Sequence, residues 1–133
     1  GNRIRKIVIA TGEVSTIVSG LSANPTGLTI IGPNLYASGY GSHQILRVVI
    51  ATGAVTSLAG STSGFANGTG ASAQFNQPEG ITTDGTDLYV ADFLNRRIRK
   101  IVVATGAVTT LAGSGVSAFL DGTGTSAQFT SPL

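Results

Sequence analysis

The sequence has no cysteine, methionine or tryptophan, and it has a single histidine, His43. Without cysteine there is neither a disulfide framework nor thiol chemistry, and one histidine alone cannot build a three-ligand zinc site. No apolar run approaches the roughly 18 residues that a membrane-spanning helix needs. We therefore expect no metal, no cofactor and no membrane span.

Charge and helical periodicity are scarce as well. Only 11% of the 133 residues are charged, and apolar residues do not recur at the i, i+3, i+4, i+7 spacing of an amphipathic helix. The chain consists instead of short runs rich in valine, isoleucine and threonine, separated by glycine, asparagine and aspartate, which is typical of strands and tight turns. The predicted fold class is all-β. Low charge with abundant serine, threonine and glycine is typical of a secreted or cell-surface protein, and we expect that location.

One segment occurs three times, as IRKIVIATG, ILRVVIATG and IRKIVVATG. The copies begin at Ile4, Ile45 and Ile98, so they lie 41 and 53 residues apart (45 − 4 and 98 − 45). An inserted loop at 62–77 accounts for the longer spacing, and a near copy of that loop follows the third segment at Phe119–Pro132. Self-similarity at a period of roughly 40–50 residues indicates a repeat architecture.

Between the loops, two units align without a gap, because Pro25–Val48 lies over Pro78–Ile101 at a constant offset of 53. Each unit contains four apolar runs joined by short glycine-containing turns, which predicts four antiparallel strands, named a to d in chain order. The predicted strands are Gly27–Ile31, Leu35–Ser38, Ile45–Ala51 and Ala54–Ala59 in one unit, and Gly80–Thr83, Leu88–Ala91, Ile98–Ala104 and Ala107–Ala112 in the other. Four strands per repeat indicate a β-propeller blade.

Residues Pro78–Gly113 contain five short motifs in this order: P-x-G, D-G, L-Y-V-A-D, N-R-R-I-R-K-I and T-G-x-V-x-T-L-A-G. This segment resembles the NHL repeat. The loop pattern F-x-[DN]-G-T-G-x-x-A-x-F-x-x-P resembles the linker between blades in bacterial and plant members of that family. The resemblance implies a propeller segment of four-stranded antiparallel blades, about two and a half in number. We expect the outer two strands of a first blade at 1–20, further blades at 25–61 and 78–114, and interblade linkers at 62–77 and 115–133.

Blades of this kind cover their apolar faces only against neighbouring blades, and propellers typically have 4–8 of them. We therefore expect the chain to be part of a larger ring or assembly, made either of one longer parent chain or of further copies of itself.

Asp92 and Arg97 are replaced together by Gly39 and Gln44 in the other unit. The simultaneous loss of a carboxylate and a guanidinium predicts a charge-assisted pair that braces the turn between strands b and c. The alternative is that Asp92 lines a face of the propeller as a ligand or an acid–base group. We expect the structural brace.

Basic side chains gather in the third segment, and a similar set occurs near the start of the chain. Such a cluster can bind nucleic acid, and some NHL propellers use a basic face for single-stranded RNA. Aromatic side chains for base stacking are few, however, with 5 phenylalanines and 3 tyrosines in the whole chain. We expect solvated or paired charges here and no nucleic-acid partner. The basic residues are Arg96, Arg97, Arg99 and Lys100, with Arg3, Arg5 and Lys6 near the start.

The turns between strands b and c carry Tyr40 and His43 in one unit and Phe93 and Arg96 in the next, and we predict that these four residues form an exposed binding patch. The chain is accordingly interpreted as a non-enzymatic scaffold that binds a protein or another ligand, with no catalytic residue. Two alternatives remain open: a structural subunit of a self-assembling surface filament or ring, and a part of an NHL-like lyase or hydrolase whose catalytic residues lie in other blades. Asn67 begins an N-glycosylation sequon, Asn-Gly-Thr.

Overall fold

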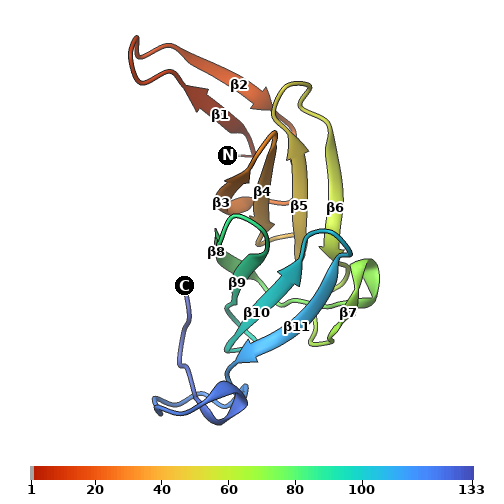
Figure 1. Ribbon diagram of the computed structural model, residues 1–133, viewed down its shortest axis with the longest axis vertical. Helices are drawn as coiled ribbons and strands as arrows, with labels where there is room; N and C mark the ends of the chain where they lie inside the picture. Colours follow the sequence, from red (N-terminus) through yellow and green to blue (C-terminus); the bar gives the residue numbers. More distant parts are fainter. Residues whose placement is uncertain (1) are drawn as a thin grey trace.

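The computed structural model describes residues 2–133, whose regular structure is almost entirely antiparallel β-sheet (Figure 1). The first sheet has two strands, β1 (Ile4–Ile7) and β2 (Val14–Val18). The second sheet has four strands in chain order, β3 (Pro25–Ile31), β4 (Asn34–Gly39), β5 (Gln44–Val49) and β6 (Val55–Gly60). The all-β prediction is confirmed, and within residues 2–133 no helix is long and apolar enough to cross a membrane.

The third sheet has five strands. Four of them follow chain order: β8 (Pro78–Thr83), β9 (Leu88–Asp92), β10 (Arg97–Val102) and β11 (Ala107–Ala112). The fifth, β7 (Gly68–Thr69), comes from the preceding loop and pairs with the outer edge of β11. Single turns of 3₁₀ helix follow at η1 (Gly70–Ser72) and at the matching η2 (Gly124–Ser126).

Strand c is shorter than predicted in both units, because β5 ends at Val49 and β10 at Val102. The turn to strand d starts there, and the backbone N–H groups of Thr52 and Gly53 both donate to the carbonyl of Val49, at 3.3 and 2.8 Å. Gly53 closes the turn at a φ of 73°, in the left-handed region that favours glycine. Apolar residues after Val49 therefore belong to the turn, although their sequence suggests a strand.

Apolar side chains fill the spaces between neighbouring sheets. One buried cluster lies between the second and third sheets and includes Tyr36, Ile45, Val90 and Ile101, together with Phe75 from the linker. Another lies between the first and second sheets and includes Ile4, Leu21, Ala37, Leu46 and Val48. Successive residues of β4 and β5 face opposite clusters because strand side chains alternate between the two faces of a sheet. The sheets follow one another along the long axis of the molecule like successive blades (Figure 1).

Candidate functional site

A fully buried ion pair joins β9 and β10. Arg99 Nη1 lies 2.7 Å from Asp92 Oδ2, and neither side chain is exposed to solvent. The backbone N–H of Asn76 donates to Asp92 Oδ1 at 2.8 Å, and Asn95 Nδ2 donates to Asp92 Oδ2 at 2.7 Å. The carboxylate thus accepts three hydrogen bonds, which offset the cost of burying its charge.

The predicted pairing of Asp92 with Arg97 is wrong. The two residues do lie opposite each other across β9 and β10. However, Arg97 Nη2 donates to the carbonyl of Ser114 at 2.8 Å, and its guanidinium lies 3.8 Å from the centre of the Phe65 ring. Arg99 is the diagonal cross-strand neighbour of Asp92, at a separation of about 7–8 Å that a long side chain can bridge. The brace therefore uses the arginine two residues further along the strand.

Arg99 also holds the loop that precedes the third sheet. Its Nη1 donates to the carbonyl of Gln74 at 2.9 Å, and its Nη2 donates to the carbonyl of Ala66 at 2.8 Å and to Asn67 Oδ1 at 3.0 Å. The guanidinium carbon lies 4.8 Å from the centre of the Phe65 ring and 5.0 Å from that of Phe75. We name this arrangement the linker clasp; it comprises Asp92, Asn95, Arg97, Arg99, Phe65 and Phe75.

The chemistry of the clasp is structural. Burial raises the pKa of the Asp92 carboxyl, although the hydrogen bonds from Asn76, Asn95 and Arg99 act in the opposite direction. Burial likewise lowers the pKa of Arg99. A guanidinium nevertheless keeps its proton in proteins, so the carboxylate faces a cation. Since both oxygens of Asp92 are engaged and shielded from solvent, the geometry suits a brace and not an acid–base group.

The four predicted binding residues lie in two matching turns, one between β4 and β5 and the other between β9 and β10. Tyr40, His43, Phe93 and Arg96 are all half-buried. His43 and Arg96 have left-handed backbones, with φ values of 57° and 54°, so the two turns share an uncommon conformation. The structure thus places the four residues at equivalent points of neighbouring sheets. That they bind a ligand stays a prediction.

His43 makes a contact between neighbouring sheets. Its Nδ1 accepts a hydrogen bond of 3.1 Å from the backbone N–H of Gln77, the residue directly before β8. In the other turn, Arg96 Nε is buried and has no hydrogen-bond partner among residues 2–133. His43 and Arg96 therefore make different contacts at equivalent positions.

The sequence places Arg99 only in the basic cluster, without predicting that it pairs with Asp92, and it gives no prediction for Leu94. Arg99 corresponds to Leu46 in the other unit, so its charge disappears together with that of Asp92, as does the charge of Arg97. The same comparison could therefore have identified it. Leu94 lies in the predicted turn and is 39% exposed, but a single exposed leucine gives no signal in the sequence.

A second hydrogen-bonded carboxylate lies at the turn between β8 and β9. Asp84 Oδ1 accepts hydrogen bonds from the backbone N–H groups of Thr86 and Asp87, at 2.9 and 2.8 Å, and Tyr89 donates its hydroxyl to Asp84 Oδ2 at 2.8 Å. These bonds lower the pKa of Asp84 to about 2. The bond to Asp84 is also the main reason why the pKa of Tyr89 is raised.

Within residues 2–133, no three histidine, cysteine, aspartate or glutamate side chains gather closely enough to hold a metal ion. Asn67 is exposed, and its Oδ1 accepts hydrogen bonds from Arg99 at 3.0 Å and from Thr110 Oγ1 at 3.1 Å. A glycan would attach to Nδ2, and glycosylation of this residue stays a prediction.

No family model matches the chain. Individual proteins do, and the chain is 37% identical over 86 residues to NHL repeat-containing protein 2 of Gallus gallus, a match that covers 64% of this chain. The chain belongs to the NHL-repeat β-propeller family. The NHL chain is also 32% identical over 124 residues, 83% of its length, to the protein SUPPRESSOR OF QUENCHING 1, chloroplastic, of Arabidopsis thaliana. It spans 12% of the length of each of these two relatives.

Solved structures show the same fold. The NHL chain superposes with a TM-score of 0.81 and 27% identity on a protein of unknown function from Bacteroides thetaiotaomicron, over 98% of this chain and 36% of the other. An auxiliary nutrient binding protein from the same species gives a TM-score of 0.71 at 20% identity, over 89% and 33%. A virginiamycin B lyase from Staphylococcus aureus gives 0.57 at 22% identity, over 82% and 33%. The prediction of an NHL-like propeller segment is confirmed.

Proposed function

We propose that this NHL chain is a segment of a non-enzymatic propeller that binds a protein or another ligand outside the cytoplasm. The proposed binding surface is the b–c turn face, defined by Tyr40, His43, Phe93 and Arg96. We further propose that blades occupy 25–61 and 78–114, that 1–20 provides the outer half of another blade, and that 62–77 and 115–133 are interblade linkers.

The observation that carries the proposal is the repetition of the b–c turns. Each turn has one partly exposed aromatic ring and one basic side chain. The backbone is left-handed at the equivalent residue of both turns, His43 and Arg96. The hydrogen bond from Gln77 to His43 fixes one turn against the next sheet. Aromatic rings held in a fixed position supply contact area at low entropic cost, so such turns suit binding.

The charges of the third sheet support a scaffold. Asp92 and Arg99 pair with each other inside the linker clasp, and Asp84 accepts hydrogen bonds from the backbone of its own turn. Solved propellers of similar fold include an auxiliary nutrient binding protein and a virginiamycin B lyase. At 20% and 22% identity, these similarities support the fold and not a particular function. The low charge of the sequence supports the extracellular location.

A selection for binding peptides tests the proposed face. A phage-displayed library of random peptides would be selected against the immobilised chain, and the enriched peptides measured against the double variant Tyr40→Ala/Phe93→Ala. We expect binding at least about tenfold weaker, because full burial of one large apolar side chain contributes about 1.5–3 kcal/mol.

The matched control is Tyr89→Ala, which removes an aromatic ring at the opposite end of β9. It should leave the affinity of the same peptides unchanged. Peptides that bind the double variant as tightly as the unaltered chain would show that the ligand surface lies elsewhere on the propeller.

A further inference from the structure

The chain contains one asparagine that is followed directly by a glycine, Asn67, in the loop before the third sheet. In an Asn-Gly pair the glycine has no side chain to shield its backbone nitrogen, so this nitrogen can approach the side-chain carbonyl carbon of the asparagine closely. Asn67 is exposed, and water therefore reaches it. The sequence places a chemically labile pair directly beside the linker clasp.

The loop requires the glycine of this pair. A Cβ atom at Gly68 would lie 3.1 Å from both the carbonyl carbon and the Cβ of Ser72, closer than such contacts normally are. The later loop has Gly122 at the equivalent place, where a Cβ atom would lie 2.9 Å from the carbonyl carbon of Ser126. A larger residue at either position would displace the turn of 3₁₀ helix, so the labile pair cannot be removed by replacing its glycine.

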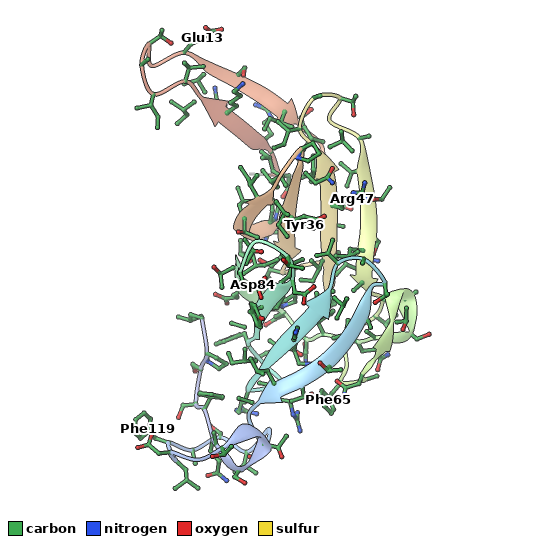
Figure 2. The ribbon with its side chains drawn as sticks, in the orientation of Figure 1. Glu13, Tyr36, Arg47, Phe65, Asp84 and Phe119 are labelled. Carbon is green, nitrogen blue, oxygen red and sulfur yellow. The ribbon has the colours of Figure 1, made fainter. Side chains whose placement is uncertain are left out.

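Two donors hold the side chain of Asn67. Its Oδ1 accepts a hydrogen bond of 3.0 Å from Arg99 Nη2 and one of 3.1 Å from Thr110 Oγ1. Arg99 is fully buried, and its guanidinium carbon lies 4.8 Å from the ring centre of Phe65, which Figure 2 labels. The two donors come from β10 and β11, so Oδ1 points toward the sheet and the amide group is held in one orientation.

The backbone on both sides of Asn67 is held as well. The carbonyl of Ala66 accepts a hydrogen bond of 2.8 Å from Arg99 Nη2, and Gly68 pairs with Val108 in the ladder between β7 and β11. A bond between the Gly68 nitrogen and Asn67 Cγ can form only after the backbone and the side chain of Asn67 have rotated. The contacts to β10 and β11 oppose both rotations, so the reaction needs a local opening of the loop.

We propose that Asn67–Gly68 is a deamidation site that the linker clasp and Thr110 keep unreactive. When the loop opens, the Gly68 backbone nitrogen gives up its proton and bonds to Asn67 Cγ. The Cγ–Nδ2 bond breaks, and the amide nitrogen leaves as ammonia with that proton. Water then opens the succinimide ring to give aspartate or isoaspartate.

The isoaspartate product changes the path of the chain. Its main chain runs through Cβ and Cγ, which inserts an extra backbone atom directly before Gly68. This insertion moves β7 out of register with β11, so the reaction releases the edge strand of the third sheet. All the groups that control the reaction lie between residues 66 and 110, inside one copy of the chain.

Mass spectrometry of the full 133-residue chain, produced without glycosylation, tests the proposal. Deamidation raises the mass, and a peptide map assigns the change to residue 67. At mildly alkaline pH the folded chain should react at least about tenfold more slowly than the same chain in guanidinium chloride, because only the open form reacts. Thr110→Val should accelerate the reaction of the folded chain about two- to tenfold, the factor that corresponds to one hydrogen bond.

Thr109→Val is the matched control, because Thr109 is an exposed threonine of the same strand whose side chain points to the other face. It should react like the unaltered chain. Asn67→Asp has no amide at this position and should lose the fast increase of mass in guanidinium chloride. A folded chain that reacts as fast as the denatured one, or a Thr110→Val chain that reacts no faster than Thr109→Val, would overturn the proposal.

Hydrogen exchange tests the release of β7. In the fraction that contains isoaspartate, the backbone amides of 68–70 should exchange at least about tenfold faster than in the unreacted chain, because they no longer pair with β11. Equal exchange in the two fractions would show that the edge strand stays paired after the reaction and would overturn this part of the proposal.

Discussion

Removal of either charge from the Asp92–Arg99 pair leaves the other one buried without a partner. The second sheet avoids both charges, because Gly39 and Leu46 occupy the equivalent positions. Asp92→Gly and Arg99→Leu should therefore each lower the free energy of unfolding by about 3–5 kcal/mol. The double variant has the same two residues as the second sheet. Its free energy of unfolding should fall by less than the sum of the two single decreases.

Urea unfolding of the four proteins closes this cycle. The coupling free energy between the two sites should fall at about 0.5–3 kcal/mol in favour of the double variant. Arg47→Leu on β5 serves as a control for the loss of an exposed arginine and should change stability by no more than about 0.5 kcal/mol. Strictly additive losses would mean that Asp92 and Arg99 do not depend on each other.

Asp84 gives the fold a dependence on acid pH. Its hydrogen bonds to Asp87, Thr86 and Tyr89 lower its pKa from 3.8 to about 2, so the folded state favours the carboxylate. The stability that this preference contributes is present above the unfolded pKa and is lost as the pH falls through the folded one. The thermal midpoint should therefore fall between about pH 5 and pH 2, and by less in Asp84→Asn, which does not titrate. The difference should be modest because Asp84 is exposed. An equal fall of the thermal midpoint in both proteins across this range would show that Asp84 does not contribute to the pH dependence.

The linkers act as structural elements of the cores between sheets. Phe75 is 0% exposed within the cluster between the second and third sheets, whereas its counterpart Phe129 is half-buried. Phe75→Ala should lower the free energy of unfolding by about 3–5 kcal/mol, and Phe129→Ala by clearly less, measured by urea unfolding of dilute protein. Equal losses would mean that Phe75 does not connect the two sheets.

Most strands could be predicted because alternation and turn residues act locally. The predicted strands a, b and d agree with the observed ones to within a few residues, and the constant offset between the units predicts their common topology. The predicted strand c is too long because Ile50 and Val103 are apolar. Hydrogen bonds to the carbonyls of Val49 and Val102 place these two residues in the turn to strand d. β7 was missed because Gly68 and Thr69 carry no strand signal of their own, and the edge of β11 determines their conformation.

The ionic site could be predicted only in part. A paired loss of charge indicated that Asp92 has a basic partner, but two arginines fit that pattern. Which one reaches the carboxylate depends on the path of the side chains across the sheet and on the carbonyls of Gln74 and Ala66. These contacts are long-range, so no local pattern in the sequence encodes them.

At the scale of the whole molecule, stability is distributed between neighbours. Each buried cluster is shared by two sheets, so the loss of one sheet uncovers the next. In architectures of this type, the free energy of unfolding is approximately a sum of repeat terms and interface terms. The first sheet therefore depends on Leu35, Leu46 and Val48 of the second sheet for the cover of its one buried face.

The linker clasp has a consequence for the duplication of blades within such chains. The third sheet has both the long loop and the Asp92–Arg99 pair, while the second has only the short connection 21–24 before it and the neutral Gly39 and Leu46. A gene duplication that copied four strands without the loop would create a blade whose arginine has no carbonyls to bind. An arginine at this position of a blade therefore requires the loop before it, and the blade without the loop has uncharged residues at both positions, Gly39 and Leu46.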